Sequence, residues 1–306
     1  MESVFVGIEI GGTKIQVVTG DDQAQVVTRN RFNADLVKGA EGIREQIAAA
    51  LADIAKRQQI AAIGVGFGGP FNRETGRTCC SHQVEGWDDF PLCDWLSEQA
   101  AGALVAIDND ANTAALGEAL AGAGRGLSPV FYVTLGSGIG GGLVIDGTIY
   151  HGALPTEAEI GHVRLHQAGE TLESRCSGWA VDRRLREYAA GNPASYLAKR
   201  RDDEGDEARH LAKAMAAGDA GAMAIFDETC AGLALGLSHV VHLINPLVII
   251  LGGGLSLIGE PLRVSVEAAL GSAIMDVLKP GPEVRLAQLG EDTVPVGALF
   301  LALNAG

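Results

Sequence analysis

The chain has 306 residues and a formal net charge of −15, with 47% hydrophobic and 20% charged residues. This length is enough for two ordinary domains, and the acidic balance argues against nonspecific binding to nucleic acid or to anionic membranes. We find no signal-peptide pattern at the N-terminus and no apolar run of about 18 residues, so we expect a cytoplasmic protein without membrane partners. Five cysteines without framework spacing fit reduced thiols.

The first strong pattern is a glycine-rich turn between two strands. Residues 4–10 alternate apolar side chains on one face, which predicts a strand, and Gly11-Gly12-Thr13-Lys14 follows it. Residues 15–19 are again strand-like. A glycine turn between two strands is a hairpin, whereas Walker and Rossmann loops lead into a helix, so both of those nucleotide-binding motifs are excluded.

The next segment continues an α/β pattern. Apolar residues at spacings of four, four and three predict an amphipathic helix over 41–57, and 60–67 reads as a buried strand ending in Gly68-Gly69-Pro70. Residues 78–95 are loop-like, with polar residues around Trp87 and a helix opened by Pro91. Polar groups beside an aromatic ring make either a sugar-binding edge or an ordinary surface loop, and the sequence leaves both interpretations open.

Three polar residues then follow a short apolar run. Residues 105–107 read as the end of a buried strand and 111–121 as a helix, so Asp108, Asn109 and Asp110 lie at a strand-to-helix junction. Side chains at such a junction project into the crevice where α/β proteins bind ligands. Asp and Asn are also favoured helix N-caps, and on this stretch alone a capping role for Asp110 is the stronger interpretation.

The second half repeats the opening pattern. A strand at 131–135, a glycine-rich loop at 136–142 and a strand at 143–145 are followed by a helical region over 206–244. A buried strand at 247–251 leads into a third glycine cluster, and 294–303 is helix-like. Because each half begins with a glycine-turned hairpin, we expect two similar α/β domains with a cleft between them. Glycine is required where the backbone approaches a phosphate closely, so the three glycine clusters are candidate phosphate-binding turns.

With these motifs together, the chain resembles the ROK family of sugar kinases and regulators, within the actin-like ATPase and hexokinase superfamily, over essentially its full length. The order and spacing of five stretches carry the resemblance: Gly11-Gly12-Thr13-Lys14, Asn109-Asp110-Ala111-Asn112, Gly136 to Gly142, Glu159-Ile160-Gly161-His162 and Leu251-Gly252-Gly253-Gly254. The resemblance implies two actin-like (ribonuclease H-like) α/β domains flanking a cleft. We expect an N-terminal lobe of residues 1–110 plus 293–306 and a C-terminal lobe of residues 111–292.

The resemblance also implies an ATP-dependent sugar kinase and the roles of its residues. In family members, the Asp that matches Asp110 deprotonates the sugar 6-hydroxyl, and the Asn that matches Asn109 holds a neighbouring hydroxyl. Glu159, His162 and Glu173 match residues that contact the sugar. The glycine-rich loops are expected to bind ATP through the following residues: Gly11, Gly12, Thr13, Gly136, Ser137, Gly138, Gly252, Gly253 and Gly254. Asp108 has no role in the family motif, and we expect it to support the junction.

Two positions depart from the family pattern. Many members carry a Cys-x-Cys-Gly-x-x-Gly-Cys zinc motif, but residues 174–183 contain only Cys176, so we expect no structural zinc. Glu9 stands where the first phosphate loop usually has Asp, and it can act through water on the Mg²⁺ that bridges ATP oxygens. Glu at this position also resembles some ROK fructokinases. We interpret Lys14 as a surface charge outside the core site.

We therefore predict a homodimeric, Mg²⁺- and ATP-dependent glucokinase. A fructokinase or an N-acetylhexosamine kinase is the enzymatic alternative, although the bulk of Leu154-Pro155-Thr156-Glu157 disfavours an N-acetyl group. The non-enzymatic alternative is a sugar-sensing regulator that has lost catalysis. A ROK repressor would carry a helix-turn-helix domain before the first Gly-Gly-Thr, and 10 residues precede Gly11, so we do not favour it.

Overall fold

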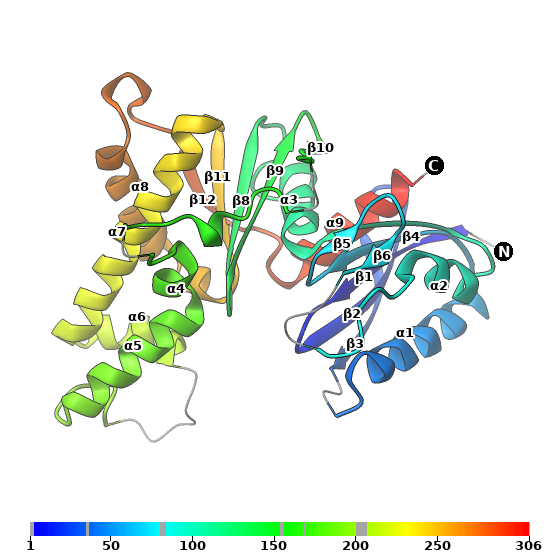
Figure 1. Ribbon diagram of the computed structural model, residues 1–306, viewed down its shortest axis with the longest axis horizontal. Coiled ribbons are helices and arrows are strands. Elements are labelled where there is room, and N and C mark those ends of the chain that lie inside the picture. Colours follow the sequence, from blue (N-terminus) through cyan, green and yellow to red (C-terminus); the bar gives the residue numbers. More distant parts are fainter. Residues whose placement is uncertain are drawn as a thin grey trace. The chain divides into compact units, whose positions relative to one another are not determined.

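The computed structural model describes residues 3–34, 37–79, 84–153, 156–167, 169–199 and 207–305 (Figure 1). The chain separates into two compact units. Unit 1 consists of residues 1–126, 142–157 and 288–306, and unit 2 consists of residues 127–141 and 158–287. The start and the end of the chain therefore belong to the same unit.

Unit 1 is built on a five-stranded sheet with the strand order β3-β2-β1-β4-β7. The strands are β1 (Ser3–Ile10), β2 (Lys14–Gly20), β3 (Val26–Asn33), β4 (Gln59–Phe67) and β7 (Leu104–Asn109). β2 pairs antiparallel with both β1 and β3, whereas β4 is parallel to β1 and to β7. The predicted glycine hairpin is therefore the turn between β1 and β2.

The register of the parallel strands decides which residues meet at their carboxyl ends. Ile10 pairs with Phe67, and Phe67 pairs with Asn109, so β1, β4 and β7 all end on one line across the sheet. The residues that follow these strands come from three distant parts of the sequence. They are brought to one edge, which is where ligands bind in sheets of this kind.

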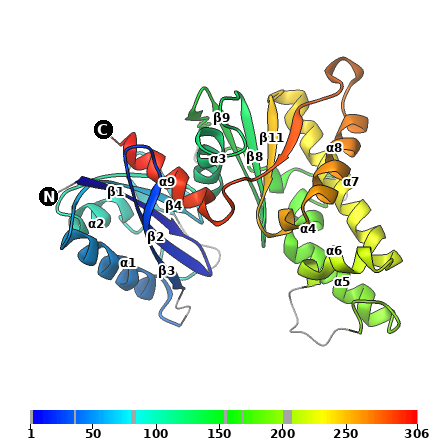
Figure 2. The same ribbon diagram turned by 180° about the vertical axis from the view of Figure 1, so that it is seen from behind.

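Helices cover both faces of this sheet (Figures 1 and 2). α1 (Gly39–Ala55) and α2 (Leu92–Gln99) share a core with alternate residues of β1, such as Val6 and Ile8. α9 (Thr293–Leu303) packs on the other face, where Gly64 leaves room for it. A Cβ atom on Gly64 would lie 1.8 Å from the carbonyl oxygen of Ala298, so only glycine permits this close approach.

The helix that follows the junction packs inside unit 1. α3 (Asp110–Leu120) lies against α9, and a Cβ atom on Gly297 would meet the carbonyl oxygen of Thr113 at 1.8 Å. The short strands β5 (Phe71–Asn72) and β6 (Arg77–Thr78) form a separate antiparallel pair. By its packing, α3 therefore belongs to unit 1. The boundary between the two kinase lobes that was expected after residue 110 stays a prediction.

Unit 2 contributes to a second five-stranded sheet, with the order β10-β9-β8-β11-β12. The strands are β8 (Val130–Leu135), β9 (Ile139–Ile145), β10 (Thr148–Ile149), β11 (Val248–Gly252) and β12 (Glu283–Leu286). β11 runs parallel to β8 and to β12. The glycine-rich loop is shorter than expected, because β9 already begins at Ile139 and only residues 136–138 separate it from β8.

The helices of unit 2 are α4 (Leu172–Cys176), α5 (Gly178–Gly191), α6 (Leu211–Ala216), α7 (Ala220–Leu243) and α8 (Glu260–Ala273). Of these, α6 and α7 lie in the region expected to be helical over 206–244, whereas α4, α5 and α8 lie outside it. Gly218, at φ +76°, and Asp219, whose side chain caps α7, interrupt the helix expected over 206–244. α7 ends before Asn245, which adopts a left-handed conformation at φ +52° ahead of Pro246.

α7 also corrects the expectation that no apolar run is long enough to cross a membrane. By length and composition it passes that test, with a mean hydropathy of 1.3 over its most apolar window, of which 50% is buried. Core helices of soluble proteins meet the same criterion, so α7 is weak evidence for a membrane span.

The prediction of two similar α/β domains is confirmed. For the 78–95 segment the sequence left a sugar-binding edge and a surface loop open, and the burial of Trp87 bears on the first of these. Trp87 is only 1% exposed and packs edge-on against Phe67, with 5.4 Å between ring centroids. Because its ring is enclosed in the core of unit 1, Trp87 is not an exposed platform for a sugar. His82 and Gln83, which were part of the same interpretation, lie outside the described residues.

Candidate active site

The junction between β7 and α3 carries the predicted base. The Oδ1 atom of Asn109 accepts a hydrogen bond of 2.8 Å from the backbone N–H of Ala111, so Asn109 is the N-cap of α3. Asp110 is therefore not the N-cap residue, although its Oδ1 atom also accepts a hydrogen bond of 2.8 Å from the N–H of Ala111. Asp110 is the first residue of the helix and is half-buried, and its carboxylate lies at the positive end of the helix dipole.

The first phosphate loop lies next to this junction. The backbone N–H of Gly11 donates to the carbonyl oxygen of Lys14 at 3.1 Å and closes the turn. Gly68 lies between the loop and the base: its N–H donates to Ile10 O at 2.9 Å, and a Cβ atom on Gly68 would lie 3.5 Å from Asp110 Oδ2 and 3.7 Å from Gly11 Cα. The structure thus brings Gly11 and Asp110 together. Gly68 was seen in the sequence only as the end of a strand.

Glu9 is held by two side chains of the neighbouring strand. The Nε2 atom of Gln16 donates to Glu9 Oε2 at 2.6 Å, and Lys14 Nζ lies 3.3 Å from the same oxygen. Lys14, which was interpreted as a surface charge, is 25% exposed and pairs with Glu9, so it is not an isolated surface charge; its place outside the core site stays a prediction. The Glu9 carboxylate, 15% exposed, is consequently kept beside the phosphate loop.

In unit 2, the second phosphate loop contacts a predicted sugar residue. Glu173 Oε2 accepts a hydrogen bond of 2.8 Å from the backbone N–H of Ile139, directly after the loop. Gly138 permits this contact, because a Cβ atom there would lie 2.5 Å from Glu173 Oε2. The N–H of Gly178, the first residue of α5, donates to Gly136 O at 2.7 Å. The loop, Glu173 and the N-terminus of α5 therefore form one local structure.

Glu159 and His162 lie one helical turn apart. Residues 160–162 form a 3₁₀ turn, and the N–H of His162 donates to Glu159 O at 3.1 Å. Side chains three residues apart eclipse in a 3₁₀ helix, so this turn is compatible with the expectation that both side chains lie on one side, which stays a prediction. Gly161 allows the turn to pack against β9, because a Cβ atom there would lie 2.2 Å from Ile139 O and 3.4 Å from the Cβ of Glu173.

The third glycine cluster forms a tight turn at the end of β11. Gly253 has φ +79°, which favours glycine, and a Cβ atom on it would lie 2.6 Å from the backbone of Leu135 at the end of β8. A Cβ atom on Gly252 would lie 2.2 Å from the hydroxyl of Tyr132. These glycines therefore bring the ends of β8 and β11 together, and their contact with adenosine stays a prediction.

The cysteine left from the zinc motif is inside the core. Cys176 is 0% exposed, and burial raises the pKa of its thiol to about 12. Burial likewise raises the pKa of Cys230 to about 12. Metals bind the thiolate, and at neutral pH these groups are thiols. The expectation of no structural zinc stays a prediction that metal analysis can test.

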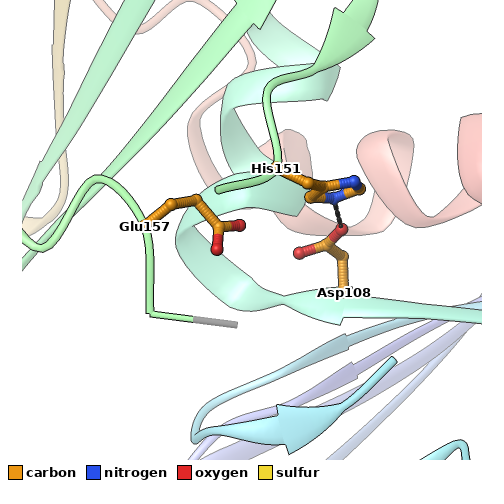
Figure 3. A group of neighbouring side chains, drawn as sticks. All are labelled: Asp108, His151 and Glu157. Atoms are coloured by element: carbon orange, nitrogen blue, oxygen red, sulfur yellow. Dashed lines mark hydrogen bonds and ion pairs between the residues drawn. The ribbon is translucent and has the colours of Figure 1, made fainter. Parts of the chain in front are cut away.

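The residues that sequence reasoning missed surround Asp108. His151 Nε2 lies 2.7 Å from Asp108 Oδ2, and Glu157 lies beside them (Figure 3). Asp108 is 43 and 49 positions from these partners, and no local pattern signals such contacts. The only hint was the position of Asp108 itself, directly before the junction.

The predicted site residues fall into two groups, each assembled within its own unit. The first group, in unit 1, contains Glu9, Gly11, Gly12, Thr13, Asn109 and Asp110. The second group, in unit 2, contains Gly136, Ser137, Gly138, Glu159, His162, Glu173, Gly252, Gly253 and Gly254. The first supplies a carboxylate beside a glycine turn, and the second supplies further glycine turns beside hydrogen-bonding side chains.

Comparison with known proteins covers both groups. A family model described as the ROK family matches residues 5–305. The glucokinase of Halalkalibacterium halodurans is 31% identical over 311 residues, which cover 97% of this chain and 94% of the relative. The glucokinase of Thermotoga maritima is 31% identical over 303 residues, covering 96% of this chain and 95% of the relative.

A solved structure agrees with these relatives. The ROK family glucokinase from Streptomyces griseus, in complex with glucose and AMPPNP, has a TM-score of 0.84 and 30% identity, and the match covers 98% of this chain and 99% of that one. This likeness confirms the expected fold of two actin-like α/β domains. Since the family model and these proteins match the chain from end to end, the protein belongs to the ROK family.

Proposed function

We propose that the protein is an ATP-dependent glucokinase that transfers the γ-phosphoryl group of ATP to the 6-hydroxyl of glucose. The observation that carries the proposal is the position of Asp110 at the end of β7, beside Gly68 and the first phosphate loop. Phosphoryl transfer requires a base within reach of the attacking oxygen, next to groups that hold the phosphates. The full-length similarity to glucokinases supports glucose as the acceptor.

Each predicted residue has a defined part in this reaction. Asp110 takes the proton from the 6-hydroxyl as that oxygen attacks the γ-phosphorus and the bridging oxygen leaves with ADP. The Oδ1 atom of Asn109 is committed to capping α3, so its Nδ2 group is the donor for a neighbouring sugar hydroxyl. Glu159, His162 and Glu173 bind the remaining hydroxyls.

The nucleotide is held mainly by backbone groups. With a net charge of −15, the chain relies on N–H groups of glycine turns for phosphate binding: those of Gly11 to Thr13 and of Gly136 to Gly138. Gly252 to Gly254 contact the adenosine. A bound Mg²⁺ would neutralise the charge of the phosphates, and such ions are usually held by one or two carboxylates and several waters. Glu9 would hold the ion through a bound water and not directly, because its carboxylate lies beside the first phosphate loop but is already paired with Lys14 at 3.3 Å.

The remaining expectations complete the proposal. The enzyme is cytoplasmic and a homodimer, it binds no structural zinc, and its lobes divide near residues 110 and 292. Sugar binding closes these lobes, which excludes water and suppresses hydrolysis of ATP.

A coupled assay with ATP and a panel of sugars tests the proposal. Glucose is expected to give the highest kcat/KM, ahead of mannose, fructose and N-acetylmannosamine. If fructose or an N-acetylhexosamine is preferred, the choice of glucose is wrong and the kinase assignment stands. No phosphorylation of any sugar in the panel would overturn the kinase proposal in favour of a sugar-binding regulator.

Asp110→Asn tests the assigned base. The substitution keeps the size of the side chain but removes its basicity, so we expect kcat to fall by at least about 10²-fold, while glucose affinity changes little. The matched control is Asp53→Asn, the same chemical change on a carboxylate that is 49% exposed on α1. Steady-state kinetics and calorimetric titration with glucose measure the two quantities. Unchanged kcat in Asp110→Asn would remove Asp110 from the role of base.

A further inference from the structure

A polar cluster in unit 1 surrounds the buried side chain of Asp108, and we name it the junction clamp; the side chain of its member His151 is 40% exposed. Its members are Arg73, Asp108, Asn112, His151 and Glu157. They come from three separate segments: the turn between β5 and β6, the β7–α3 junction and the chain after β10. Figure 3 shows Asp108, His151 and Glu157. Asp108 is 2% exposed and the side chain of Glu157 is 5% exposed, so two carboxylates are enclosed together.

Asp108 holds the start of α3. Its Oδ1 atom accepts hydrogen bonds from the backbone N–H of Asn109 at 2.8 Å and from Nδ2 of Asn112 at 2.9 Å. Its Oδ2 atom lies 2.7 Å from Nε2 of His151. The carboxylate thereby restrains the backbone directly before Asp110 and ties it to the segment that follows β10.

Glu157, six residues after His151, contacts the same junction. Its Oε1 atom accepts a hydrogen bond of 2.7 Å from Nδ2 of Asn112 and also pairs with the guanidinium of Arg73. Arg73 Nη2 lies 3.8 Å from Asp108 Oδ1 as well. Asn112 and Arg73 therefore both bridge the two carboxylates, and residues 151 and 157 are each anchored at the same junction.

The clamp is not arranged for maximal stability. Three of its buried atoms, Arg73 Nε, Asn112 Oδ1 and Glu157 Oε2, have no hydrogen-bond partner among the described residues. An unsatisfied buried polar group costs roughly 1–3 kcal/mol, and apolar residues of similar size would avoid that cost. Polar groups held at such a cost next to a reacting group are more readily explained by function than by stability.

A metal ion is a weaker explanation of the same residues. Ligand atoms of Asp108, His151 and Glu157 lie within 4.8 Å of one another, as a metal site would require. However, the guanidinium of Arg73 already pairs with Glu157 and lies near Asp108, so a cation between these carboxylates would be repelled by it. The Asp108 oxygens are also engaged by Asn109, Asn112 and His151.

We propose that Asp108 and Glu157 are positioning residues for phosphoryl transfer. The clamp fixes the backbone of Asn109 and Asp110, and it anchors His151 and Glu157, of which Glu157 lies two residues before Glu159 in the sequence. This inference rests on the proposed function, because it assigns the clamp to the same reaction. A displacement of about 1 Å at a reacting group can lower the rate by about 10²-fold, so the effect is expected in kcat.

Kinetics of four variants test this role: Asp108→Ala, Asp108→Asn, Glu157→Gln and the exposed control Asp53→Asn. In Asp108→Ala we expect kcat to fall by about 10²-fold, with the KM for glucose within about threefold of the wild-type value. Asn keeps an acceptor for the Asn109 N–H and can donate to His151, so Asp108→Asn is expected to retain about tenfold more activity than Asp108→Ala. A kcat within twofold of wild type in Asp108→Ala would overturn the proposal. If that variant fails to fold, wild-type kcat in both Asp108→Asn and Glu157→Gln would overturn it.

Hydrogen exchange gives a readout that does not depend on activity. We expect backbone amides of residues 109–113 and 151–153 to exchange at least about tenfold faster in Asp108→Ala, and those of α1 to be unchanged. Unchanged exchange at both segments would overturn the clamp even if the protein is a kinase. Conversely, faster exchange in a protein that phosphorylates no sugar would support the clamp and refute only the proposed function.

Metal analysis of purified, tag-free protein provides the last arm. We expect no stoichiometric zinc or manganese. One such ion per chain that is lost in Glu157→Gln would overturn the clamp in favour of a metal site.

Discussion

Glu118 links α3 to α9, and its replacement is expected to destabilise unit 1. The side chain is 0% exposed. Its oxygens accept hydrogen bonds from the backbone N–H groups of Ala123, Gln288 and Leu289 and from the hydroxyl of Thr293, at 2.8 to 3.3 Å. A buried carboxylate is tolerated when donors surround it in this way.

Glu118→Gln changes one oxygen into an NH₂ group without changing the shape of the side chain. Oε2 accepts from both Ala123 and Gln288, so an amide nitrogen at that position would face two donors. Turning the amide over would instead leave the N–H of Leu289 without an acceptor, whereas the Thr293 hydroxyl can still donate to Gly290 O at 2.8 Å. In the better of the two orientations one donor stays unsatisfied, which implies a loss of about 1–3 kcal/mol in the free energy of unfolding, against the roughly 5–15 kcal/mol typical of domains.

Urea unfolding followed by tryptophan fluorescence measures this loss. Trp87 and Trp95 belong to unit 1, and Trp179, 65% exposed in unit 2, can be replaced by Phe so that the signal reports on unit 1. We expect a lower midpoint at an unchanged m-value. The control is Glu45→Gln, whose side chain is 57% exposed and pairs with Lys38, and which should change the free energy by less than about 0.5 kcal/mol. A similarly small change in Glu118→Gln would refute the reasoning.

Two further predictions concern unit 2. In Gly138→Ala the new Cβ would lie 2.5 Å from Glu173 Oε2, the flexible end of a side chain. We therefore expect kcat/KM for glucose to fall at least about tenfold, while the melting temperature changes little. The control is Gly191→Ala, where no atom lies within 4 Å of the added Cβ. Equal kinetics in the two variants would contradict this prediction. Burial raises the pKa of Cys176 to about 12, so a fraction of only about 10⁻⁴ of this residue is thiolate at pH 8. After brief alkylation, peptide mass spectrometry should therefore find Cys176 unmodified and the exposed Cys79 modified. Equally fast modification of Cys176 would show that the thiol is not enclosed.

Local pattern was sufficient for most of the elements. The alternation of residues 4–10 corresponds to β1, and the helical spacing over 41–57 corresponds to α1. These patterns are reliable because one face of each element packs against the core. The predicted bounds were wrong in two places. Gly218 and Asp219 end one helix and begin the next within the alanine-rich stretch that was predicted as a single helix, and β9 begins inside the stretch that was predicted as a glycine-rich loop.

Burial of single side chains was beyond the reach of local pattern. Trp87 stands among polar residues, yet Phe67 and Phe90 enclose it. Glu118 follows Gly117 in a helix and resembles an ordinary exposed glutamate, but it is fully buried. Both outcomes depend on which distant segment covers the residue, and hydropathy at the position itself carries no information about that.

The sequence by itself determined the α/β class, the glycine turns and the family, because these follow from local spacing and from the order of motifs along the chain. Only the tertiary structure decided that Asn109 caps α3, that Lys14 pairs with Glu9 and that Asp108 is enclosed by Arg73 and His151. The physical reason is the register of β1, β4 and β7, which aligns the ends of strands that are about fifty residues apart in sequence. Side chains beyond those ends become neighbours through pairing that no single segment encodes.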